Sequence, residues 1–117
     1  MGRMRNSFLA LGALLLALPS APAFAGAGSF TVVNGTTVDI SSLSIRRTGT
    51  DNWQALAGAP PAGASSGVSF SDPDCAFDLR ASLAGGGTAI WSGVNLCGTS
   101  RLTLQRRASG ETWVDYD

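Results

Sequence analysis

The sequence predicts an all-β protein: a small antiparallel β-sandwich with one disulfide, after a cleavable signal peptide, with a small barrel as the alternative. Three observations support this fold class. Short β-branched and aromatic stretches lie between clusters of Gly, Pro, Asn and Asp, which favour turns. Apolar and polar residues alternate over 75–83, as in a strand with one buried face. After the leader, no stretch has the apolar spacing of an amphipathic helix.

The N-terminal segment has the three parts of a secretory signal peptide. Arg3 and Arg5 supply positive charge, an uncharged apolar run follows over 8–18, and small residues in an A-x-A pattern occupy 23–25. The apolar run is shorter than the roughly 18 residues that a transmembrane helix needs. We therefore expect cleavage after Ala25, which leaves no stable membrane anchor.

Cleavage near Ala21 or Ala27 is the lesser option. The predicted organisation is a signal peptide over 1–25 and a single β domain over 26–117, in a periplasmic or secreted protein. After cleavage six arginines face eight acidic residues, a net charge of −2. This weakly acidic balance argues against nucleic acid as a partner, because phosphate binding needs clustered cations.

The first predicted strands flank an Asn-Gly turn signal. Residues 29–34 are β-branched and aromatic, and the turn signal stands at 34–35. Residues 38–47 form the next predicted strand. The apolar positions of that strand change phase by one residue, which predicts a bulge or a bend near 41–42.

The middle of the domain is dominated by residues that break regular structure. We expect a short turn over 53–56 and a loop over 57–67, where Gly, Ala, Pro and Ser leave little apolar surface. A short strand is expected over 68–71. The Asp-Pro-Asp sequence at 72–74 is expected to turn the chain into its clearest strand.

The clearest strand covers 75–83, and the remaining strands follow at short intervals. Alternation places Cys75 and Phe77 on the buried face, and Asp78 with Arg80 on the solvated face, where we expect them to form an ion pair. The glycines at 85–87 are expected at a loop or hairpin tip. Further strands are predicted over 88–91, 94–97, 101–107 and 112–116.

The only cysteines, Cys75 and Cys97, are predicted to form a disulfide, as cysteine pairs in exported proteins do. The alternation of the strand predicts that the Cys75 sulfur points into the core beside Phe77. The bridge would join either neighbouring strands or opposed sheets, and both remain open. By the chain-entropy estimate it contributes roughly 3 kcal/mol to stability.

Several motifs together resemble a family of small exported bacterial domains of uncharacterised function. The motifs are N-G-T-T-V-x-I-x-x-L-x-I at 34–45, Trp53, C-x-F-D-L-R-A at 75–81 and G-V-N-L-C at 93–97, and the resemblance spans about 30–104. The chain differs from the family pattern at Arg46-Arg47, where small polar residues are usual. The resemblance implies a β fold and a disulfide, and it implies no catalytic or ligand-binding residue.

The composition argues against catalysis, and we predict neither catalytic residues nor a cofactor or metal. The chain contains no His, and it contains no Lys for Schiff-base chemistry. The aspartates at 72 and 74 are too few for a calcium site, which needs six to eight oxygen ligands. They are better explained by an Asp-Pro turn. A hydrolase that uses paired aspartates is the least favoured function.

An Arg-Arg pair stands six residues before a tryptophan in two places. If the two segments converge, they form a surface that binds a small anion or an acidic protein, because guanidinium groups pair with carboxylates and stack on indole rings. Solvated strand ends beside half-buried tryptophans explain the same residues without a ligand. The candidate surface consists of Arg46, Arg47, Trp53, Arg106, Arg107 and Trp113.

The leading hypothesis is a non-catalytic secreted or periplasmic interaction module whose partner is an unknown protein or small anionic ligand. A leader, a disulfide and a chain without the usual catalytic side chains motivate it. The alternative is a structural or self-associating cell-envelope protein, because exposed sheet edges can template assembly.

Overall fold

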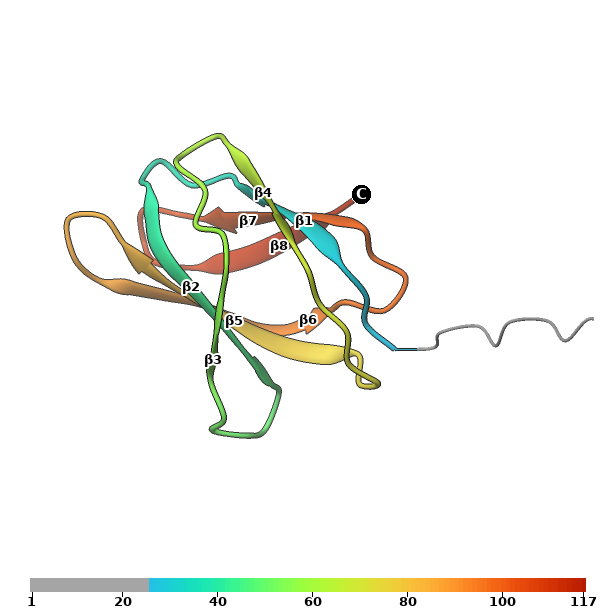
Figure 1. The fold of residues 1–117 in the computed structure, drawn as a ribbon. Coiled ribbons are helices and arrows are strands. Elements are labelled where there is room, and N and C mark those ends of the chain that lie inside the picture. The colour runs from blue at the N-terminus through green and yellow to red at the C-terminus, as the bar shows by residue number, and fades with distance from the viewer. Residues whose placement is uncertain (1–25) are drawn as a thin grey trace, which may run out of the picture.

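The computed structural model describes residues 26–117, which form an all-β sandwich of two four-stranded sheets (Figure 1). The predicted signal peptide, 1–25, lies outside the described residues. The described residues form no helix, so none of them makes a helical membrane span. The strands are β1 (Phe30–Asn34), β2 (Ile40–Arg47), β3 (Gln54–Leu56), β4 (Ser65–Val68), β5 (Ala76–Leu83), β6 (Thr88–Asn95), β7 (Arg101–Arg106) and β8 (Thr112–Tyr116).

One sheet has the strand order β4-β1-β7-β8 and the other has the order β3-β2-β5-β6. Within these sheets only β1 and β7 pair in parallel, and the other neighbours are antiparallel. The predicted antiparallel sandwich is therefore confirmed, with one parallel pair that the sequence does not signal. Since β1 and β2 belong to different sheets, the neighbours of β1 are β4 and β7, which follow much later in the chain.

The core lies between the two sheets and follows the alternation of the strands. Buried residues alternate with more exposed ones in β1, in β7 and in β6 up to its bulge, and the buried apolar surface contributes about 25 cal/mol per Å². Trp91 is the largest fully buried side chain, and its Nε1 donates a hydrogen bond to the carbonyl of Gln105 on the other sheet at 2.8 Å. The largest other core residues are Phe77, Leu43, Leu79, Leu96, Leu102 and Leu104.

Asn34 stabilises the connection between β1 and β2, which passes from one sheet to the other. Its side-chain amide donates to the carbonyls of Val38 and Pro60 at 2.8 and 3.0 Å, and its Oδ1 accepts from the amide and the hydroxyl of Thr36. Asn34 is fully buried, so its bonds with Pro60 and Thr36 form away from water, while the bond to the Val38 carbonyl is partly buried. The Asn-Gly turn signal thus marks a connection between sheets, and it does not form a two-residue hairpin.

The bulge predicted near 41–42 is confirmed, because the register between β2 and β5 shifts between Ile40 and Ser42. A second irregularity occurs in β6 opposite Asp78, where Gly93 adopts a positive φ of 64°. The sequence splits this region into two strands, whereas it is one strand with a bulge. The three glycines at 85–87 all have positive φ and form the predicted tip between β5 and β6.

Three predictions for the middle of the chain are wrong. The strand expected over 68–71 is found at Ser65–Val68 instead, so that the two overlap only at Val68. The turn expected over 53–56 contains strand β3, which pairs with β2. The loop expected over 57–67 ends early, because Ser65–Val68 form β4 on the edge of β1. Pairing with β1 satisfies the backbone of this polar segment, so it becomes a strand without apolar alternation.

The disulfide between Cys75 and Cys97 is present and joins neighbouring strands, since it links the residue before β5 to the segment after β6. The prediction that its sulfur points into the core is wrong. Cys75 is exposed because it precedes β5 and lies outside the alternation of that strand, while Phe77 is buried.

Candidate functional site

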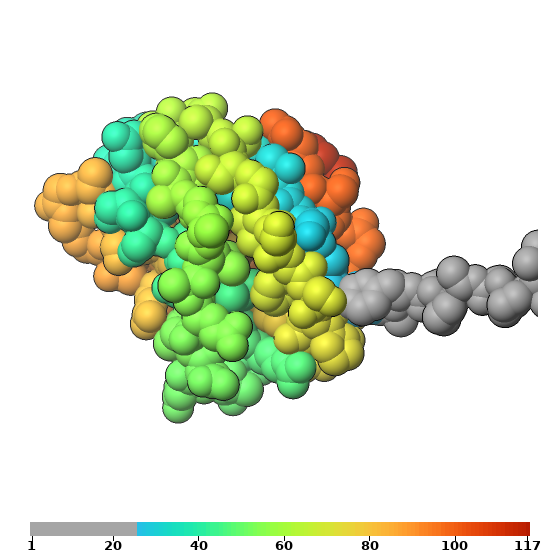
Figure 2. Space-filling model, in the orientation of Figure 1, coloured from blue at the N-terminus to red at the C-terminus, as the bar shows by residue number. Residues whose placement is uncertain are grey.

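A pocket opens on the side of the sandwich where the edge strands β3 and β4 belong to different sheets. Its volume is about 360 Å³, and the 50–56 and 68–74 segments on either side of it share one face of the molecule (Figure 2). We call it the edge pocket. It is lined by Ile45, Arg46, Arg47, Thr50, Asn52, Gln54, Phe70, Asp72 and Phe77.

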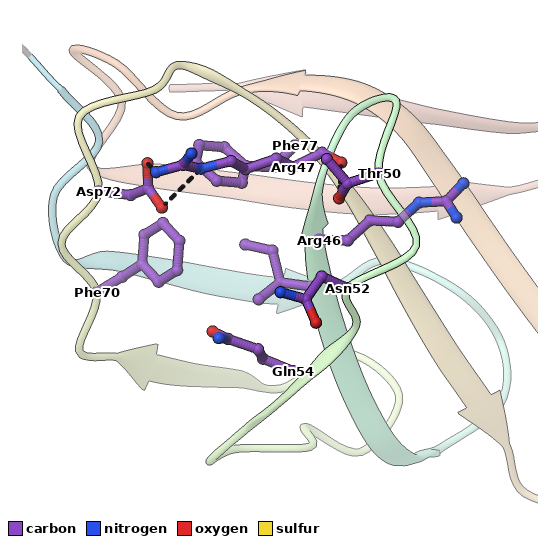
Figure 3. A pocket seen from close by; sticks show the side chains of 9 residues that line it. Arg46, Arg47, Thr50, Asn52, Gln54, Phe70, Asp72 and Phe77 are labelled. Atoms are coloured by element: carbon purple, nitrogen blue, oxygen red, sulfur yellow. Dashed lines mark hydrogen bonds and ion pairs between the residues drawn. The ribbon is translucent and has the colours of Figure 1, made fainter.

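The apolar wall of the edge pocket comes from the core itself. Ile45 and Phe77 are buried residues of β2 and β5. Phe70 is half-buried, and its ring meets Phe77 edge to face with centroids 5.2 Å apart. It contacts Phe30 in the same manner at 6.1 Å. Edge-to-face contacts fix the ring, so Phe70 is a rigid wall between the core and the pocket (Figure 3).

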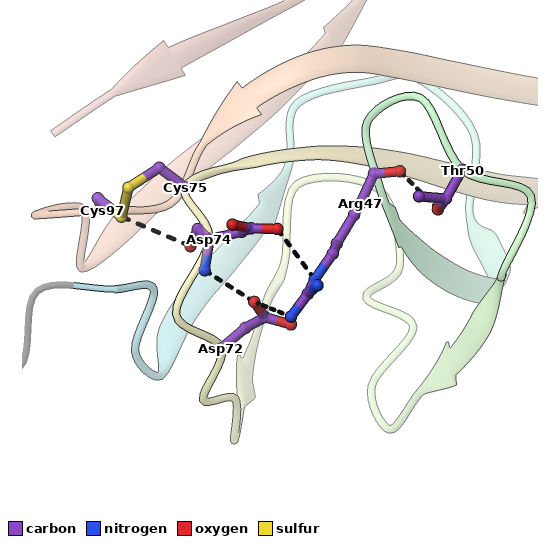
Figure 4. Close-up of polar contacts among 6 residues, drawn as sticks. All are labelled: Arg47, Thr50, Asp72, Asp74, Cys75 and Cys97. Atoms are coloured by element: carbon purple, nitrogen blue, oxygen red, sulfur yellow. Dashed lines mark hydrogen bonds and ion pairs between the residues drawn. A yellow bond between two sulfur atoms is a disulfide. The ribbon is translucent and has the colours of Figure 1, made fainter.

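Arg47 and two aspartates form one rim of the pocket. Its Nε and Nη2 donate to the Asp72 carboxylate at 3.2 and 3.0 Å, and its Nε lies 3.1 Å from Asp74 (Figure 4). The backbone amide of Asp74 donates to Asp72 at 2.8 Å. This amide bond, with further help from Arg47, lowers the pKa of Asp72 below its ordinary value despite partial desolvation. The arginine's charge is therefore already compensated.

The same rim is fastened to the disulfide and to the start of the β domain. Cys75 follows Asp74 directly, and the sulfur of Cys97 lies 3.6 Å from the Asp74 carbonyl (Figure 4). The amide of Ala27, which is fully buried, donates to the carbonyl of Asp72 at 2.7 Å. The turn at 72–74 is consequently held from three directions.

Asn52 and Gln54 face the edge pocket from the β2–β3 side (Figure 3). Both side chains are exposed, and neither makes a side-chain hydrogen bond within residues 26–117. Each amide has two donor hydrogens and one acceptor oxygen. These are the uncommitted polar groups at the pocket, and they suit a ligand with neutral hydrogen-bonding groups.

Arg46 turns away from the pocket toward the outer face of its sheet (Figure 3). Its Nε donates to Asp78 at 2.8 Å, and Thr48 Oγ1 and the Gly93 amide complete the shell of that carboxylate. Burial alone would raise the pKa of Asp78, but the bonds from Gly93, Thr48 and Arg46 outweigh it and lower the pKa. Asp78 thus pairs across the strands and does not form the ion pair expected with Arg80.

The structure does not bring the predicted Arg/Trp surface together. Trp53 precedes β3, at one edge of its sheet, and stacks on Arg46 at 4.4 Å and on Arg80 at 4.2 Å. Trp113 lies on β8, an edge strand of the other sheet. β8 contacts β6, which is the edge of the first sheet farthest from β3. Arg107 stacks on Trp113 at 4.8 Å.

Arg107 is also paired with Glu111 at 3.0 Å, while Arg106 ends β7 half-buried. The candidate residues therefore form separate clusters, one around Trp53 and one around Trp113. Arg47 belongs to neither stack, because it is part of the pocket rim.

Sequence reasoning missed the edge pocket and most of its lining. Gln54 lies in the segment predicted as a turn, Phe70 in the predicted strand over 68–71, and Asn52 just before the turn; nothing in their local pattern marks them. Within residues 26–117 no three His, Cys, Asp or Glu side chains gather as metal ligands. The aspartates considered for calcium, Asp72 and Asp74, both face Arg47.

Comparisons with known proteins find a similar fold and identify no family. No family model and no curated protein matches the chain. The chain is similar to a solved structure described as the NMR structure of the protein from Eubacterium rectale, with a TM-score of 0.59 and 13% sequence identity. The alignment covers 83% of this chain and 94% of the other.

Proposed function

We propose that this protein is a non-catalytic, exported interaction module that binds its ligand in the edge pocket. The single observation that carries the proposal is the combination of a rigid aromatic wall with two uncommitted amides, Asn52 and Gln54, around one cavity. Binding sites typically combine an apolar lining with a few placed polar groups, and their volumes begin at about 300 Å³.

The charges around the pocket narrow the chemistry of the ligand. Arg47 is paired with Asp72 and Asp74, so a free anion would have to displace a formed ion pair. A ligand that brings an apolar group to Phe70 and neutral hydrogen-bonding groups to the amides meets no such cost. We therefore propose a neutral ligand at this pocket, either a small molecule or a side chain of a partner protein.

Export is proposed on the predicted leader and is supported by the disulfide. A disulfide persists in oxidising compartments, so the bridge between Cys75 and Cys97 indicates an extracellular type of environment. The finer assignment, to the periplasm or to the medium, is part of the proposal.

The other two candidate functions have less support. Self-association would use an edge strand. The edges β3 and β4 have only 3 and 4 residues, and short edges pair poorly. The longer edges, β6 and β8, already contact each other and share two hydrogen bonds. An aspartate-dependent hydrolase would need two available carboxylates. Asp72 and Asp74 are bound to Arg47, and Asp115 accepts a hydrogen bond from Gln105.

The proposal is tested by NMR spectra of the isotope-labelled protein, recorded while it is titrated with a panel of neutral sugars, amino acids and short peptides. A true ligand shifts the side-chain amide resonances of Asn52 and Gln54, and the variant Asn52→Ala/Gln54→Ala weakens it roughly tenfold, since two hydrogen bonds are lost. The matched control is Thr88→Ala/Ser109→Ala, which removes two exposed polar groups elsewhere. A panel without any compound that shifts the pocket resonances, or a ligand that the double variant retains, would refute the pocket assignment.

A further inference from the structure

Arg80 carries a charge that the described residues do not neutralise. It lies within β5 on the outer face of the β3-β2-β5-β6 sheet and is half-buried. Within residues 26–117 its guanidinium has no ion pair and no hydrogen-bond acceptor, and its one recorded contact is with Trp53. The aliphatic part of Arg80 is partly covered while its charged end stays accessible, as is common for arginine on a sheet face.

Trp53 holds this guanidinium in place. The ring centroid lies 4.2 Å from Arg80 Cζ and 4.4 Å from Arg46 Cζ. Arg46 is engaged by Asp78 at 2.8 Å and by Asp51 at 3.5 Å, so its charge is compensated. Stacking fixes the planar group of Arg80 while leaving its five N–H donors available. A pre-positioned arginine loses less rotamer freedom when a ligand binds.

The neighbours of Arg80 leave it accessible. The sheet register places Ser44 on one side and Ile90 on the other. Ser44 is too short to cover a guanidinium, and Ile90 is 41% exposed. The outer face therefore presents a planar cation, an indole ring and an exposed aliphatic side chain in adjacent positions. Tryptophan and arginine are the residues that most often dominate binding energy at protein interfaces.

We propose that Trp53, Arg80 and Ile90 form a docking surface for an acidic protein segment, which we call the Arg80 surface. A carboxylate of that segment pairs with Arg80, and an apolar side chain next to it packs on Ile90. Charge complementarity selects a carboxylate partner. The exposed Ile90 on an open sheet face favours a protein segment over a free anion, since only the former buries apolar area there.

The Arg80 surface uses Trp53, Arg80 and Ile90, whereas the edge pocket offers Phe70, Asn52 and Gln54 to its ligand. Arg46 lines the pocket and stacks on Trp53, but neither proposal assigns it a ligand. Each proposal can therefore fail without the other. The chain also contains a matched control. Arg107 stacks on Trp113 at 4.8 Å, but it is already paired with Glu111 at 3.0 Å. The two arginines share the aromatic contact and differ in the ion pair.

The test titrates the isotope-labelled, disulfide-bonded protein with a short peptide that has two glutamates beside one isoleucine. The same peptide with glutamines serves as the uncharged probe. We expect saturable shifts of the Arg80 Nε–H and the Trp53 indole N–H with the glutamate peptide, and roughly tenfold weaker binding of the glutamine peptide. Arg80→Gln removes this preference, whereas Arg107→Gln keeps it.

Three results would overturn the proposal. The first is equal affinity for the glutamate and glutamine peptides. The second is a loss of binding in Arg107→Gln as large as that in Arg80→Gln. The third is half-saturation by sodium acetate at the same concentration as by the glutamate peptide, which would indicate a free-anion site. Arg80→Lys controls for the possibility that Arg80→Gln loses binding because it is misfolded, since lysine keeps the positive charge but loses the planar stacking on Trp53. It is expected to bind between the wild type and Arg80→Gln.

Discussion

Asp78 is the residue at which burial, charge and backbone geometry meet. The residue is 3% exposed, and its carboxylate receives three hydrogen bonds, from Arg46, Thr48 and the amide of Gly93. The Gly93 bond ties the carboxylate to the bulge of β6, where a positive φ favours glycine. A buried carboxylate with all its partners stabilises the fold, whereas one that loses them is costly.

Asp78→Asn should lower stability at neutral pH and flatten its acid dependence. The loss at pH 7 is expected to be about 2 kcal/mol, because the hydrogen bonds to a charged acceptor weaken. The pKa of Asp78 is lowered in the folded state, so its contribution is present above the unfolded pKa of about 3.9 and is lost as pH falls through the folded pKa. Urea unfolding at pH 7 and at pH 2 measures both effects.

The control for this experiment is Asp51→Asn, since the Asp51 side chain is fully exposed although it lies 3.5 Å from Arg46. That variant should follow the wild type at both pH values. If the gap between wild type and Asp78→Asn is as large at pH 2 as at pH 7, the charged form of Asp78 does not supply the stability.

At the scale of elements, Asn34 governs how the first strand connects to the rest. The residue ends β1, and its amide bonds hold Val38 before β2 and Pro60 in the connection between β3 and β4. One side chain therefore fixes two chain connections. This role explains why an Asn-x-Thr sequence occurs here, because Thr36 supplies both a backbone and a hydroxyl donor to Oδ1.

Asn34→Ala is expected to destabilise the protein by about 2 kcal/mol. It removes the side-chain donors to the Val38 and Pro60 carbonyls, which keep only bonds from Thr36 Oγ1 and the Ile40 amide, and it leaves the buried Thr36 amide without its acceptor. The measurement is the free energy of unfolding in denaturant. Asn52→Ala is the matched control, because Asn52 is exposed and makes no side-chain hydrogen bond within the described residues. A loss within about 0.5 kcal/mol for Asn34→Ala would show that the network is not what fixes the crossing.

The elements that could be predicted are those whose signals are local. The alternation over 75–83 predicts β5, and the change of phase after Ile40 predicts the bulge in β2. β4 could not be predicted, because Ser65, Ser66 and Gly67 form a strand only by pairing with β1. The alternation predicts a buried Cys75, but β5 begins at Ala76, so Cys75 lies before the strand and outside its pattern.

The candidate site required information that local patterns do not carry. The edge pocket draws its lining from β2, from the segment before β3 and from the chain after β4. These segments meet only through the sheet order, which the sequence leaves open. Each Arg-Arg pair does contribute an arginine that stacks on the tryptophan following it, Arg46 on Trp53 and Arg107 on Trp113. The equal spacing of the two Arg-Arg pairs from Trp53 and Trp113 does not bring the two segments together, because they belong to different sheets.

At the scale of the whole molecule, the two sides of the sandwich differ. Where β6 and β8 meet, the Thr112 hydroxyl donates to the Ile90 carbonyl at 2.7 Å and the Asn95 amide donates to the Tyr116 hydroxyl at 3.0 Å. These bonds fasten one sheet to the other. The side of β3 and β4 instead contains the edge pocket. The rim of this pocket, the turn at 72–74, is held in place by the disulfide, by the Ala27 amide and by Arg47.

The disulfide should accordingly matter both for global stability and for the shape of the rim. Cys75→Ser/Cys97→Ser is expected to lose roughly 3 kcal/mol of unfolding free energy by the chain-entropy estimate. Amide exchange should accelerate most at Ala27 and Leu96, whose amides bond to carbonyls of Asp72 and Cys75. Chemical denaturation and hydrogen exchange of the variant, beside the wild type with its disulfide reduced, separate the global effect from the local one. Equal stability of all three proteins would mean that the sheets alone support the fold, while a uniform rise in exchange would mean that the bridge does not position the rim.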